Sequence, residues 1–536
     1  MFTFLILLYI FSSLNGAIYY TYLWQLKEYR LDRMIDSMRT RSGLHKIMPN
    51  FQIVKVLLLA IGIGHFFFVK DIGIFSFYAL LALSLELLEF LTRVISRQVF
   101  RPKKTTKAFL ITAGTFFLMM ILGLIVNYSV LEIGRVALYI LVISILVGDL
   151  NSLVVFLFHP ITAHMKRKVI LNAKRKMAAN KMKVIGITGS YGKSSTKEFL
   201  YQILESHYKG KVFKTPGNTN VDIGVAQEIL KGLKTEHEYA IIEMGAYKKG
   251  EIKAICDIVH PDIGVVTAVA DQHLALFGSL KNIQEAKYEL IESLGDDGVA
   301  FFNNDSEGAS ELLKWASGSD KKIISYACEG TAKVMALHVN VKEREIDFDI
   351  HGVQFMAPVF GKQNLPNLLS AISVAHECGM TLQEISKAVR KIEMPDGIMC
   401  LKESVSRGAD IFVIDDSYNA NPDGVRAALD YLANFKGYKK ILIFPGMLEL
   451  GAKTDIEHIN VGEKIRAICD FSVFTSEDFL KPIMIGLGQD YDESKYIFSD
   501  SAEVILQAIK GVSENEKAVI LFESRGAEAV MRELLK

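Results

Sequence analysis

The sequence is poor in cysteine, and the few cysteines are not arranged for disulfides or zinc. Five occur among 536 residues, an odd number, and no two have the spacing of a CxxC pair. All of them lie in the second half of the chain, at Cys256, Cys328, Cys378, Cys400 and Cys469. The length excludes a disulfide-stapled miniprotein. The cysteine pattern predicts reduced thiols in a cytosolic compartment and neither a disulfide framework nor a zinc site.

The sequence also lacks a surplus of charge of either sign. It has 61 lysines and arginines against 60 aspartates and glutamates, a formal net charge of +1. Proteins that bind nucleic acid over a large surface need a basic surplus, so no nucleic-acid partner is expected. The length allows about two to four domains.

Long apolar runs are abundant, and they raise the mean hydropathy to +0.24. Runs long enough to span a bilayer occur at about 2–24, 51–69, 72–90, 108–130 and 137–158. The first is not interpreted as a cleaved signal peptide, because it lacks a basic start and a small-residue cleavage site. Five membrane-spanning helices are therefore predicted, in a transmembrane domain that covers residues 1–165.

The segments between these runs alternate in basic charge. Six lysines and arginines lie in residues 25–50, one in 70–71, six in 91–107, one in 131–136 and eight in 159–183. Loops rich in lysine and arginine stay in the cytoplasm. The pattern thus predicts a multi-pass protein of the plasma (inner) membrane with its N-terminus outside and everything after about residue 159 in the cytoplasm. Residues 166–182 are interpreted as a basic juxtamembrane linker that contacts membrane lipids.

Charged side chains within the second and third apolar runs need an explanation, because charges are costly in lipid. Lys55 lies near one end of the second run, and its ammonium group is expected to extend to the membrane surface. Glu86 and Glu89 lie one turn apart in the third run. They pair with neighbouring helices or with Arg93, or they contact a lipid head group or a partner protein; the sequence leaves these alternatives open.

Residues 183–204 have the pattern of a buried strand, a glycine-rich turn and a helix. The turn has the spacing G-x-x-G-K-S. Its glycines let backbone N–H groups surround a phosphate, its lysine reaches the outer phosphates, and its serine hydroxyl can bind Mg²⁺. An ATP site is predicted here, formed by Gly189, Ser190, Gly192, Lys193, Ser194 and Ser195.

Further motifs follow this loop, GITGSYGKSSTK, in the order TPGNTNVDIGV, IIEMGAYKKGEI, HPDIGVVTAVADQHLALFGSL, EAKYEL, GKQNLPNLLSA, IDDSYNANP and PGMLELG. As a set they resemble the Mur ligases, ATP-dependent amide-bond-forming enzymes of peptidoglycan assembly, and the resemblance covers about two thirds of the chain. The last two motifs are most similar to the branch of the family that adds D-alanyl-D-alanine to a UDP-muramoyl tripeptide.

The resemblance implies ATP and two Mg²⁺ ions as cofactors. Ser194, Glu243, His273 and Lys287 would bind metal, and Lys193, Lys287 and His273 would be catalytic. Family members carry the lysine at the position of Lys287 as a carbamate, which turns a cation into a carboxylate-like ligand. A lysine can form a carbamate only as the neutral amine, so its site should lower its pKa.

The resemblance also implies the remaining site residues. Nucleotide contacts are expected from Asn303, Asn364, Asn367 and Asp416, and substrate contacts from Asn220, Tyr418, Asn419 and Asn421. The cluster that begins at Asp416 follows the predicted strand IFVID, and ligands bind at such strand ends in doubly wound folds. A turn-capping role is the alternative for any of its asparagines or aspartates. His458 matches a family histidine, and its role is left open.

The sequence departs from the family pattern in four features, most of which concern substrate binding. Residues 397–399 read G-I-M where the family has G-R-M or G-R-L, so Ile398 replaces an arginine expected near the phosphates. Gln363 replaces a common histidine. Residues 522–525 read F-E-S-R where the family has K-G-S-R, so Phe522 replaces a lysine expected near the substrate. The membrane helices stand in place of the small domain that holds the UDP-sugar.

The predicted organisation after the linker is a central P-loop ATP-binding domain over residues 183–393 and a Rossmann-like α/β domain over residues 394–536. Strand signals occur in VIGITG, YAIIEMG, DIGVVTAV, DIFVID, KILIFPG and AVILFES. Their alternation with helices favours mostly parallel sheets. A hinge is predicted at residues 394–397.

The predicted function is that of a membrane-anchored, ADP-forming acid–amino-acid ligase. It would join an amino acid or a dipeptide to a carboxylate of a muramyl-peptide-type envelope precursor through an acyl phosphate. A lipid-linked precursor is expected because the UDP-binding domain is replaced, and other envelope-synthesis proteins are candidate partners. Two alternatives stay open: a poly-γ-glutamate-type amide ligase, and a degenerate ATP-binding scaffold for envelope enzymes.

Overall fold

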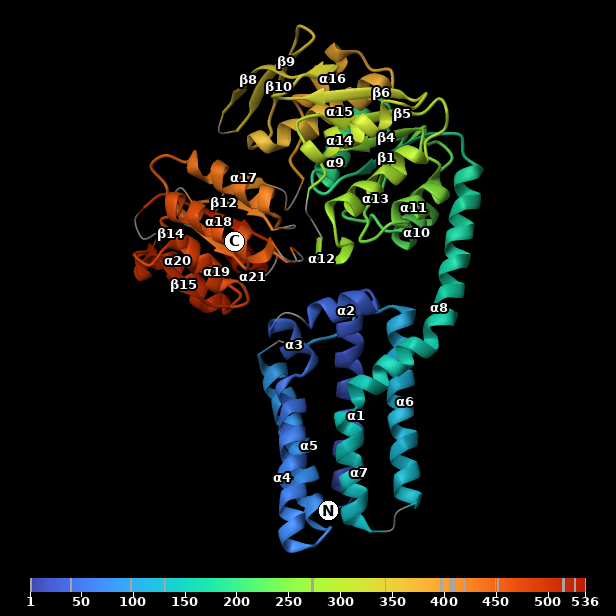
Figure 1. Cartoon of the computed structure of the whole chain (residues 1–536), viewed down its shortest axis with the longest axis vertical. Coiled ribbons are helices and arrows are strands. Elements are labelled where there is room, and N and C mark those ends of the chain that lie inside the picture. The colour runs from blue at the N-terminus through green and yellow to red at the C-terminus, as the bar shows by residue number, and fades with distance from the viewer. Residues whose placement is uncertain are drawn as a thin grey trace. The chain divides into compact units, whose positions relative to one another are not determined.

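The structure, a computed structural model, consists of two compact units, Met1–Arg167 and Lys168–Lys536 (Figure 1). It describes residues 2–38, 41–96, 99–129, 132–270, 274–342, 344–395, 397, 399–403, 411–417, 420–448, 450, 453–512, 516–524 and 527–535.

The first unit is a helical bundle. In its described part, four helices are long and apolar enough to cross a bilayer: α1 (Phe2–Leu26), α4 (Asn50–Val69), α5 (Ile74–Ile95) and α6 (Thr106–Ser129). Two short helices, α2 (Leu31–Ser37) and α3 (Arg41–Ile47), follow α1. Helices α7 (Ile133–Ile145) and α8 (Val147–Ala178) pass the same test as a pair bent by 58°. Each of the five predicted runs overlaps one of these helices or the bent pair, which gives four spans, or five when the bent pair counts as one.

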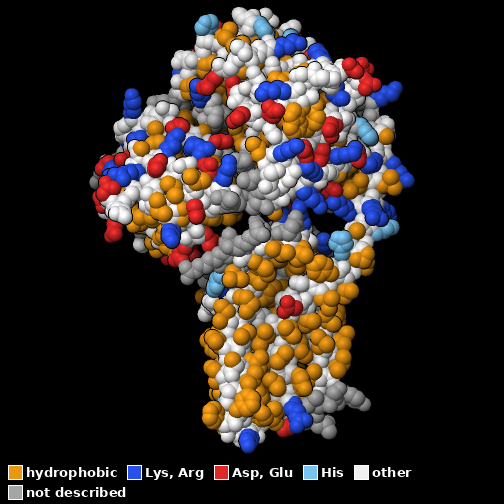
Figure 2. All heavy atoms as spheres, in the orientation of Figure 1, with side chains coloured by type: hydrophobic (Ala, Val, Ile, Leu, Met, Phe, Trp, Pro, Cys, Tyr) orange, Lys and Arg blue, Asp and Glu red, His pale blue; other side chains and the backbone are white. Residues whose placement is uncertain are grey.

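The outer surface of the bundle is apolar. Figure 2 shows hydrophobic side chains over its visible face, and Phe67 and Phe68 of α4 are 74% and 90% exposed. Soluble proteins rarely expose a continuous apolar surface of this kind. The bundle is therefore suited to contact lipid tails.

The interior of the bundle contains a buried ion pair. Nζ of Lys55 lies 2.8 Å from Oε2 of Glu86, and the two side chains are 0% and 1% exposed. Lys55 also donates to Oγ of Ser12 at 3.0 Å and to the carbonyl of Ser144 at 3.3 Å, while Asn15 donates to Oε1 of Glu86 at 2.9 Å. The prediction that Lys55 extends to the membrane surface is therefore wrong, because its ammonium group finds a complete set of acceptors inside the bundle.

The two glutamates of α5 have different partners. Glu86 pairs with α4, which confirms the helix-pairing alternative for this residue. Glu89 pairs with Arg93 on its own helix, and both side chains are about a quarter exposed. The structure thus accounts for both carboxylates with partners inside the chain.

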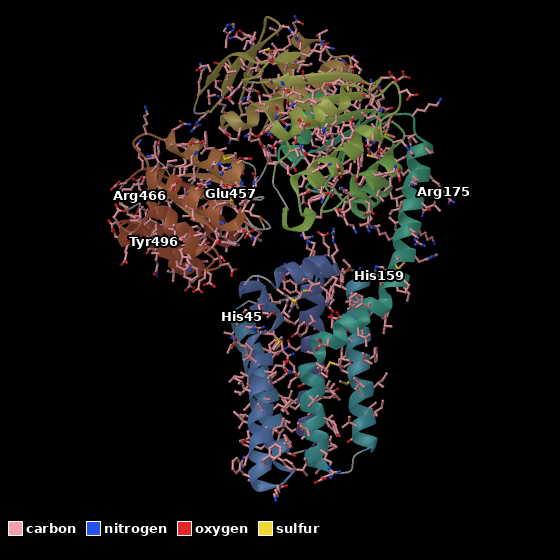
Figure 3. All side chains as sticks on the ribbon, viewed as in Figure 1. His45, His159, Arg175, Glu457, Arg466 and Tyr496 are labelled. Carbon is pink, nitrogen blue, oxygen red and sulfur yellow. The ribbon has the colours of Figure 1, made fainter. Side chains whose placement is uncertain are left out.

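Helix α8 contributes to the cores of both units. Val147, Val154 and Val155 belong to the core of the bundle, and Ala173 and Met177 belong to a core of the second unit. Figure 3 labels His159 and Arg175 on this one helix. The part of the fifth predicted span that follows the bend and most of the predicted linker therefore lie on one helix.

The second unit begins with a seven-stranded sheet in the order β2-β3-β1-β4-β5-β6-β7, and its pairs are parallel. The strands are β1 (Lys183–Thr188), β2 (Val212–Lys214), β3 (Tyr239–Glu243), β4 (Ile263–Val266), β5 (Val299–Asn303), β6 (Lys322–Ala327) and β7 (Val334–Met335). The helices are α9 (Lys193–His207), α10 (Asp222–Gly232), α11 (Glu251–Val259), α12 (Leu274–Phe277), α13 (Leu280–Glu292), α14 (Glu307–Ala316), α15 (Leu365–Glu377) and α16 (Leu382–Val389).

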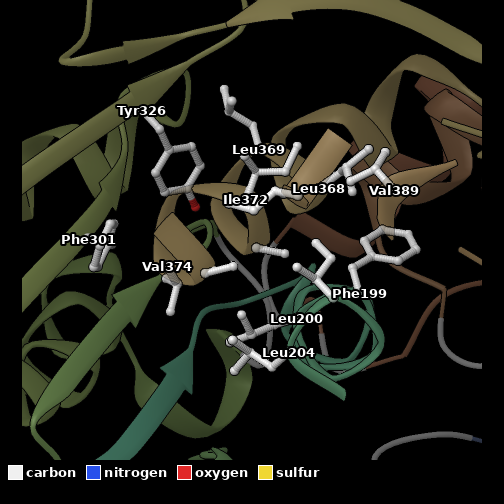
Figure 4. Packing of buried hydrophobic residues seen from close by; sticks show 14 of the residues in the cluster. Phe199, Leu200, Leu204, Phe301, Tyr326, Leu368, Leu369, Ile372, Val374 and Val389 are labelled. Atoms are coloured by element: carbon white, nitrogen blue, oxygen red, sulfur yellow. The ribbon is translucent and has the colours of Figure 1, made fainter. Parts of the chain in front are cut away.

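Two apolar cores lie on opposite faces of this sheet. Successive residues of a strand point to opposite faces, and accordingly Ile185 belongs to one core and Val184 to the other. Helices α9, α15 and α16 cover the first face, and α10, α11, α13 and α14 cover the second. Figure 4 shows part of the first core, including Phe199, Leu200, Phe301, Tyr326 and Leu368.

A small antiparallel sheet was not predicted. It consists of β8 (Leu337–Val341), β9 (Ile346–Ile350) and β10 (Val353–Ala357), paired in the order β10-β9-β8. The sequence of β9, IDFDI, alternates perfectly between apolar and acidic residues, which is the pattern of a strand with one buried face. That alternation was the signal for this sheet.

The C-terminal sheet has six strands in the order β11-β12-β16-β13-β14-β15. They are β11 (Cys400–Glu403), β12 (Ile411–Asp416), β13 (Lys439–Phe444), β14 (Phe471–Phe474), β15 (Tyr496–Phe498) and β16 (Ala518–Glu523). Only the pair β11–β12 is antiparallel among these described strands. Helices α17 (Pro422–Ala433), α18 (Thr454–Ile468), α19 (Leu480–Leu487), α20 (Ala502–Val512) and α21 (Glu528–Leu534) complete the α/β arrangement. The predicted fold class is confirmed.

All five cysteines are free thiols, as expected. Cys256, Cys378 and Cys469 are buried, and burial raises the pKa of each to about 12. These three thiols are therefore protonated and poorly reactive at neutral pH.

Candidate active site

The phosphate loop joins β1 to α9, which begins at Lys193. Gly192 has a φ of +82°, and a Cβ atom there would collide with Oδ1 of Asn367. Glycine is required at this point because it alone adopts the left-handed conformation and leaves that space free. The turn therefore places Asn367 of α15 directly against the phosphate loop.

The ammonium group of Lys193 lies inside the loop. Its Nζ donates to the carbonyl of Gly189 at 2.6 Å and to that of Ser190 at 2.9 Å. Burial lowers the pKa of Lys193, and the negative charge of Glu243 opposes this shift. The hydroxyl of Ser190 bonds to both the carbonyl and the N–H of Ala270, each at 3.0 Å, which ties the loop to the residues after β4. Ser195 is buried in the first turn of α9.

Glu243 gathers three donors at the end of β3. Its carboxylate is buried, and Oε2 accepts from Oγ of Ser194 and from Nζ of Lys197, both at 3.0 Å. Its other oxygen, Oε1, accepts from Nδ2 of Asn220 at 3.0 Å. The structure thus brings together three of the predicted site residues, Ser194, Asn220 and Glu243, and adds a lysine.

That lysine, Lys197, was missed in the sequence. Its side chain is completely buried, and besides Glu243 it donates to the carbonyl of Gly217. The signal was its position three residues before Leu200, on the apolar face of α9. A lysine on a buried face needs a carboxylate partner, and the strand ending in Glu243 offered one.

Lys287 of α13 lies close to this cluster. It is 4% exposed, and its pKa is lowered from 10.5 to about 7, first by burial and then by the positive charge of Lys193. Glu289 opposes the shift, but it is engaged by the backbone N–H groups of Gly250 and Lys253. A large fraction of Lys287 is therefore the neutral amine at neutral pH, the form that carbamate formation needs.

The oxygen groups of the cluster fit Mg²⁺. A serine hydroxyl, Ser194, and a carboxylate, Glu243, are hard ligands, and Mg²⁺ commonly uses one or two protein ligands together with phosphates and water. His273, the other predicted ligand, lies outside the described residues. Among the residues that are described, no three His, Cys, Asp or Glu side chains form a site for a metal.

The asparagines predicted to contact the nucleotide have structural partners. Asn303 ends β5, and its side chain accepts from the N–H of Asp305 at 3.1 Å. Nδ2 of Asn364 donates to the carbonyl of Phe360 at 2.7 Å. These two side chains hold their own turns, whereas Asn367 faces the phosphate loop.

The predicted substrate cluster of the C-terminal sheet is only partly described. Tyr418, Asn419 and Ile398 lie outside the described residues. The side chain of Asn421 accepts from the N–H of Gly424 at 3.0 Å and caps α17, which is the turn-capping alternative.

Asp416 lies next to a second acid that was not predicted as a site residue. It ends β12 opposite Glu523, the last residue of β16. Burial raises the pKa of Asp416 to about 7, and burial together with the charge of Asp416 raises the pKa of Glu523. The two acids therefore form a pair that does not ionise fully at neutral pH.

His458 of α18 holds the backbone at Met447 in place. Its Nε2 accepts from the N–H of Met447 at 2.9 Å, its Nδ1 lies 2.6 Å from the carbonyl of Thr454, and its ring stacks on Phe479 with centroids 4.5 Å apart. Because Nε2 accepts and Nδ1 donates, the ring is neutral. Burial lowers its pKa, which favours the same form.

We expect His458→Phe to destabilise the C-terminal domain by about 1–3 kcal/mol, because the buried N–H of Met447 loses its acceptor. Since the folded state disfavours protonated His458, the loss should be full above pH ~6.5 and shrink as pH falls below it. Denaturant unfolding of detergent-purified protein at pH 8 and pH 5.5 measures both effects. The control is His338→Phe, at an exposed histidine, and equal losses for the two variants would contradict the assignment.

Two family models match the second unit. The model of the Mur ligase middle domain matches residues 187–375, and the model described as "Mur ligase, glutamate ligase domain" matches residues 402–525. Together they account for more than half of the chain.

Curated relatives agree with these matches. The UDP-N-acetylmuramoyl-tripeptide–D-alanyl-D-alanine ligase of Bacillus subtilis is 29% identical over 359 residues, which are 66% of this chain and 76% of the relative. The ligases of the same name from Escherichia coli and Synechocystis are 32% and 33% identical over 53% of this chain. The matches span 62% and 60% of these two relatives, less than two thirds of their length.

Solved structures share the fold. MurF from Acinetobacter baumannii superposes with a TM-score of 0.61 at 27% identity, over 69% of this chain and 80% of that one. The MurF ligase from Thermotoga maritima in complex with ADP has a TM-score of 0.58 at 24% identity, over 69% and 83% of the two chains.

Proposed function

Because the chain belongs to the Mur ligase family of ATP-dependent amide ligases, we propose that it joins an amine to a carboxyl group of a muramyl-peptide-type precursor of the cell envelope. The proposed amine is a D-alanyl-D-alanine-like dipeptide or an amino acid, as the relatives' names suggest. The observation that supports catalysis best is the buried cluster of Ser194, Asn220 and Glu243 beside Lys193.

The site residues have separable roles in this proposal. The loop N–H groups and Lys193 would hold the phosphates of ATP, and Ser194 and Glu243 would hold Mg²⁺. The metal would supply positive charge at the phosphate that is transferred to the substrate carboxylate. Lys197 orients Glu243 through its 3.0 Å ion pair, and Asn220 fixes the other carboxylate oxygen.

We further propose that Lys287 is carbamylated. With ¹³C-bicarbonate and Mg²⁺, the protein should give a carbamate carbon signal in NMR that grows as pH rises from 6 to 8.5. The signal grows because the fraction of Lys287 present as the neutral amine increases as pH passes its pKa of about 7. Lys287→Gln should remove the signal, and Lys281→Gln, at an exposed lysine of the same helix, should keep it. A spectrum without the signal over this whole pH range would count against the carbamate.

The membrane bundle is proposed to bring the ligase to a lipid-linked precursor on the cytoplasmic face of the membrane. The charge pattern of the loops supports this orientation. The continuous α8, which contributes to both cores, supports a permanent attachment of the ligase to the bundle.

Phosphate release by detergent-purified protein with ATP and Mg²⁺ tests the proposal. D-alanyl-D-alanine would be supplied with the soluble UDP-muramoyl tripeptide or with its lipid-linked form, and glutamate would be supplied alone. Release that needs both the dipeptide and a muramyl acceptor is expected, with preference for the lipid-linked form. Release with glutamate alone would indicate the poly-γ-glutamate alternative, and ATP binding without turnover on any pair would indicate a scaffold.

A further inference from the structure

The carboxyl pair of the C-terminal sheet has no counterpart in the family pattern. Glu523 occupies the second position of F-E-S-R, where the family motif K-G-S-R has glycine. It ends β16, and Asp416 ends the neighbouring parallel strand β12 in direct register. The pair therefore lies at the carboxyl edge of the sheet, where doubly wound folds bind their ligands.

Glu523 is buried without a donor. It is 1% exposed, and neither of its carboxylate oxygens has a hydrogen-bond partner among the described residues apart from the acid that faces it. Asp416 accepts one hydrogen bond, from the N–H of Met399 at 3.1 Å. A buried carboxylate is costly unless it meets a cation or several donors, so the described protein leaves this pair unsatisfied.

The preceding residue, Asp415, is an acid of the same sheet whose carboxylate oxygens both have partners. Nζ of Lys402 lies 2.9 Å from its Oδ2, and the hydroxyl of Ser417 donates to its Oδ1 at 2.6 Å. The only positive charge in these contacts is therefore already used by Asp415. Its own charge raises the pKa of Asp416 further, so it adds to the need for a cation at the pair.

The chemistry of the pair selects the kind of ligand. Phosphate groups are anionic, so the pair repels them and does not suit the phosphate end of a nucleotide. Mg²⁺ held by one or two carboxylates ordinarily relies on substrate phosphates and water for its other ligands; this pair repels phosphates, and the described residues add no third acid, histidine or cysteine. A primary ammonium group carries one positive charge and three N–H donors, which match two carboxylates and leave one donor for a further acceptor.

We propose that Asp416 and Glu523 bind the primary ammonium group of the amine that the ligase joins to its acceptor; the identity of that amine rests on the proposed function. The pair shares a proton before the amine arrives. With one shared proton the pair carries a charge of −1. The positive charge of the bound ammonium lowers the pKa of the shared proton, which leaves to solvent, so the pair goes to −2, the occupied site carries −1 and the released proton balances the step. The ammonium group keeps its own proton in this step.

Calorimetric titration of the full-length protein in detergent, without ATP or acceptor, tests this site. D-alanyl-D-alanine, D-alanine, glycine and ethylammonium chloride are the probes, and N-acetyl-D-alanyl-D-alanine is the matched ligand without an ammonium group. At pH 7 in two buffers of different ionisation enthalpy, binding of at least one probe should release up to one proton. The acetylated dipeptide should bind at least about tenfold more weakly, because a charge-assisted hydrogen bond is lost.

Glu523→Gln is the main variant, and Glu503→Gln, at an exposed glutamate of α20, is its control. Glu523→Gln should weaken binding of the amine at least about tenfold and abolish proton release, while Glu503→Gln should change neither. Removing one of two facing acids relieves their repulsion, so the variant is expected to fold, and its thermal unfolding checks this. Glu523→Gly, with the glycine of the family pattern, is the second variant and should behave in the same way.

Several results would overturn the site. They are the absence of binding by every probe, equal affinity for the acetylated dipeptide, or proton release that Glu523→Gln leaves unchanged. Proton release on titration with NaCl, KCl or MgCl₂ alone, abolished by Glu523→Gln, would show that the pair binds an inorganic cation instead. Binding that depends on Glu523 without any ligation would leave this site standing and refute the proposed function. Ligation activity with a KM for the amine that Glu523→Gln leaves unchanged would support the proposed function and refute this site.

Discussion

Lys193→Met is expected to lower ATP-dependent ligation by about a thousandfold while the fold stays intact. The ammonium group is held inside the phosphate loop by two carbonyls, 2.6 and 2.9 Å away, where it can reach transferred phosphate. Removing one preorganised charge of this kind ordinarily costs about 10²–10³ in rate. Because burial already penalises the charged lysine, its replacement by an apolar chain of similar length should not unfold the domain.

Initial rates of phosphate release, with and without the amine, measure this effect. Lys253→Met is the matched control, since the side chain of this lysine is exposed and forms a surface ion pair with Asp257. The control should retain nearly the wild-type rate. A fall of less than about tenfold for Lys193→Met, with thermal stability preserved, would remove Lys193 from the catalytic role.

Glu86→Leu should destabilise the membrane bundle by about 3–5 kcal/mol, because it leaves Lys55 charged and buried with no carboxylate. The double variant Lys55→Met/Glu86→Leu should recover most of this loss, since two apolar chains can fill the space of a buried ion pair. Glu89→Leu is the control. Its pair with Arg93 is partly exposed, and its loss should cost less than about 1 kcal/mol.

The chain provides an optical reporter for this measurement. It has two tryptophans: Trp24 is buried in the bundle, and Trp315 lies on α14 of the second unit. In a Trp315→Phe background, the fluorescence of Trp24 follows unfolding of the bundle alone. Equal stability of the single and double variants would show that the ion pair is not what holds α4 to α5.

Local sequence patterns predicted most of the fold. The apolar runs and the alternation of strands with helices depend on periodicity and length, and the strands from VIGITG to AVILFES appear where they were expected. The antiparallel sheet β8–β10 was missed because its strands are short and partly exposed. The bend between α7 and α8 was missed because hydropathy indicates the length of an apolar run and not the direction of the helix axis.

The candidate site was predictable where a motif fixes the backbone, and less so where the partner is distant in sequence. The loop around Lys193 needs only local glycines. Lys197 and Glu243 are 46 residues apart, and Lys55 and Glu86 come from different helices, so each pairing depends on packing. Glu523 was noted only as part of a departure from the family pattern. Its pairing with Asp416 was not predicted, because no local sequence pattern indicates that β16 lies beside β12.

The burial of the thiols has a practical consequence for mapping the chain in a membrane. The described bundle contains no cysteine, and three of the five thiols are buried and protonated at neutral pH. With Cys328 and Cys400 replaced by serine, the protein becomes a nearly silent background for maleimide reagents. A single cysteine placed at Lys70, between α4 and α5, or at Lys103, between α5 and α6, then reports which side of a cell's membrane each turn occupies, by its labelling with an impermeant reagent.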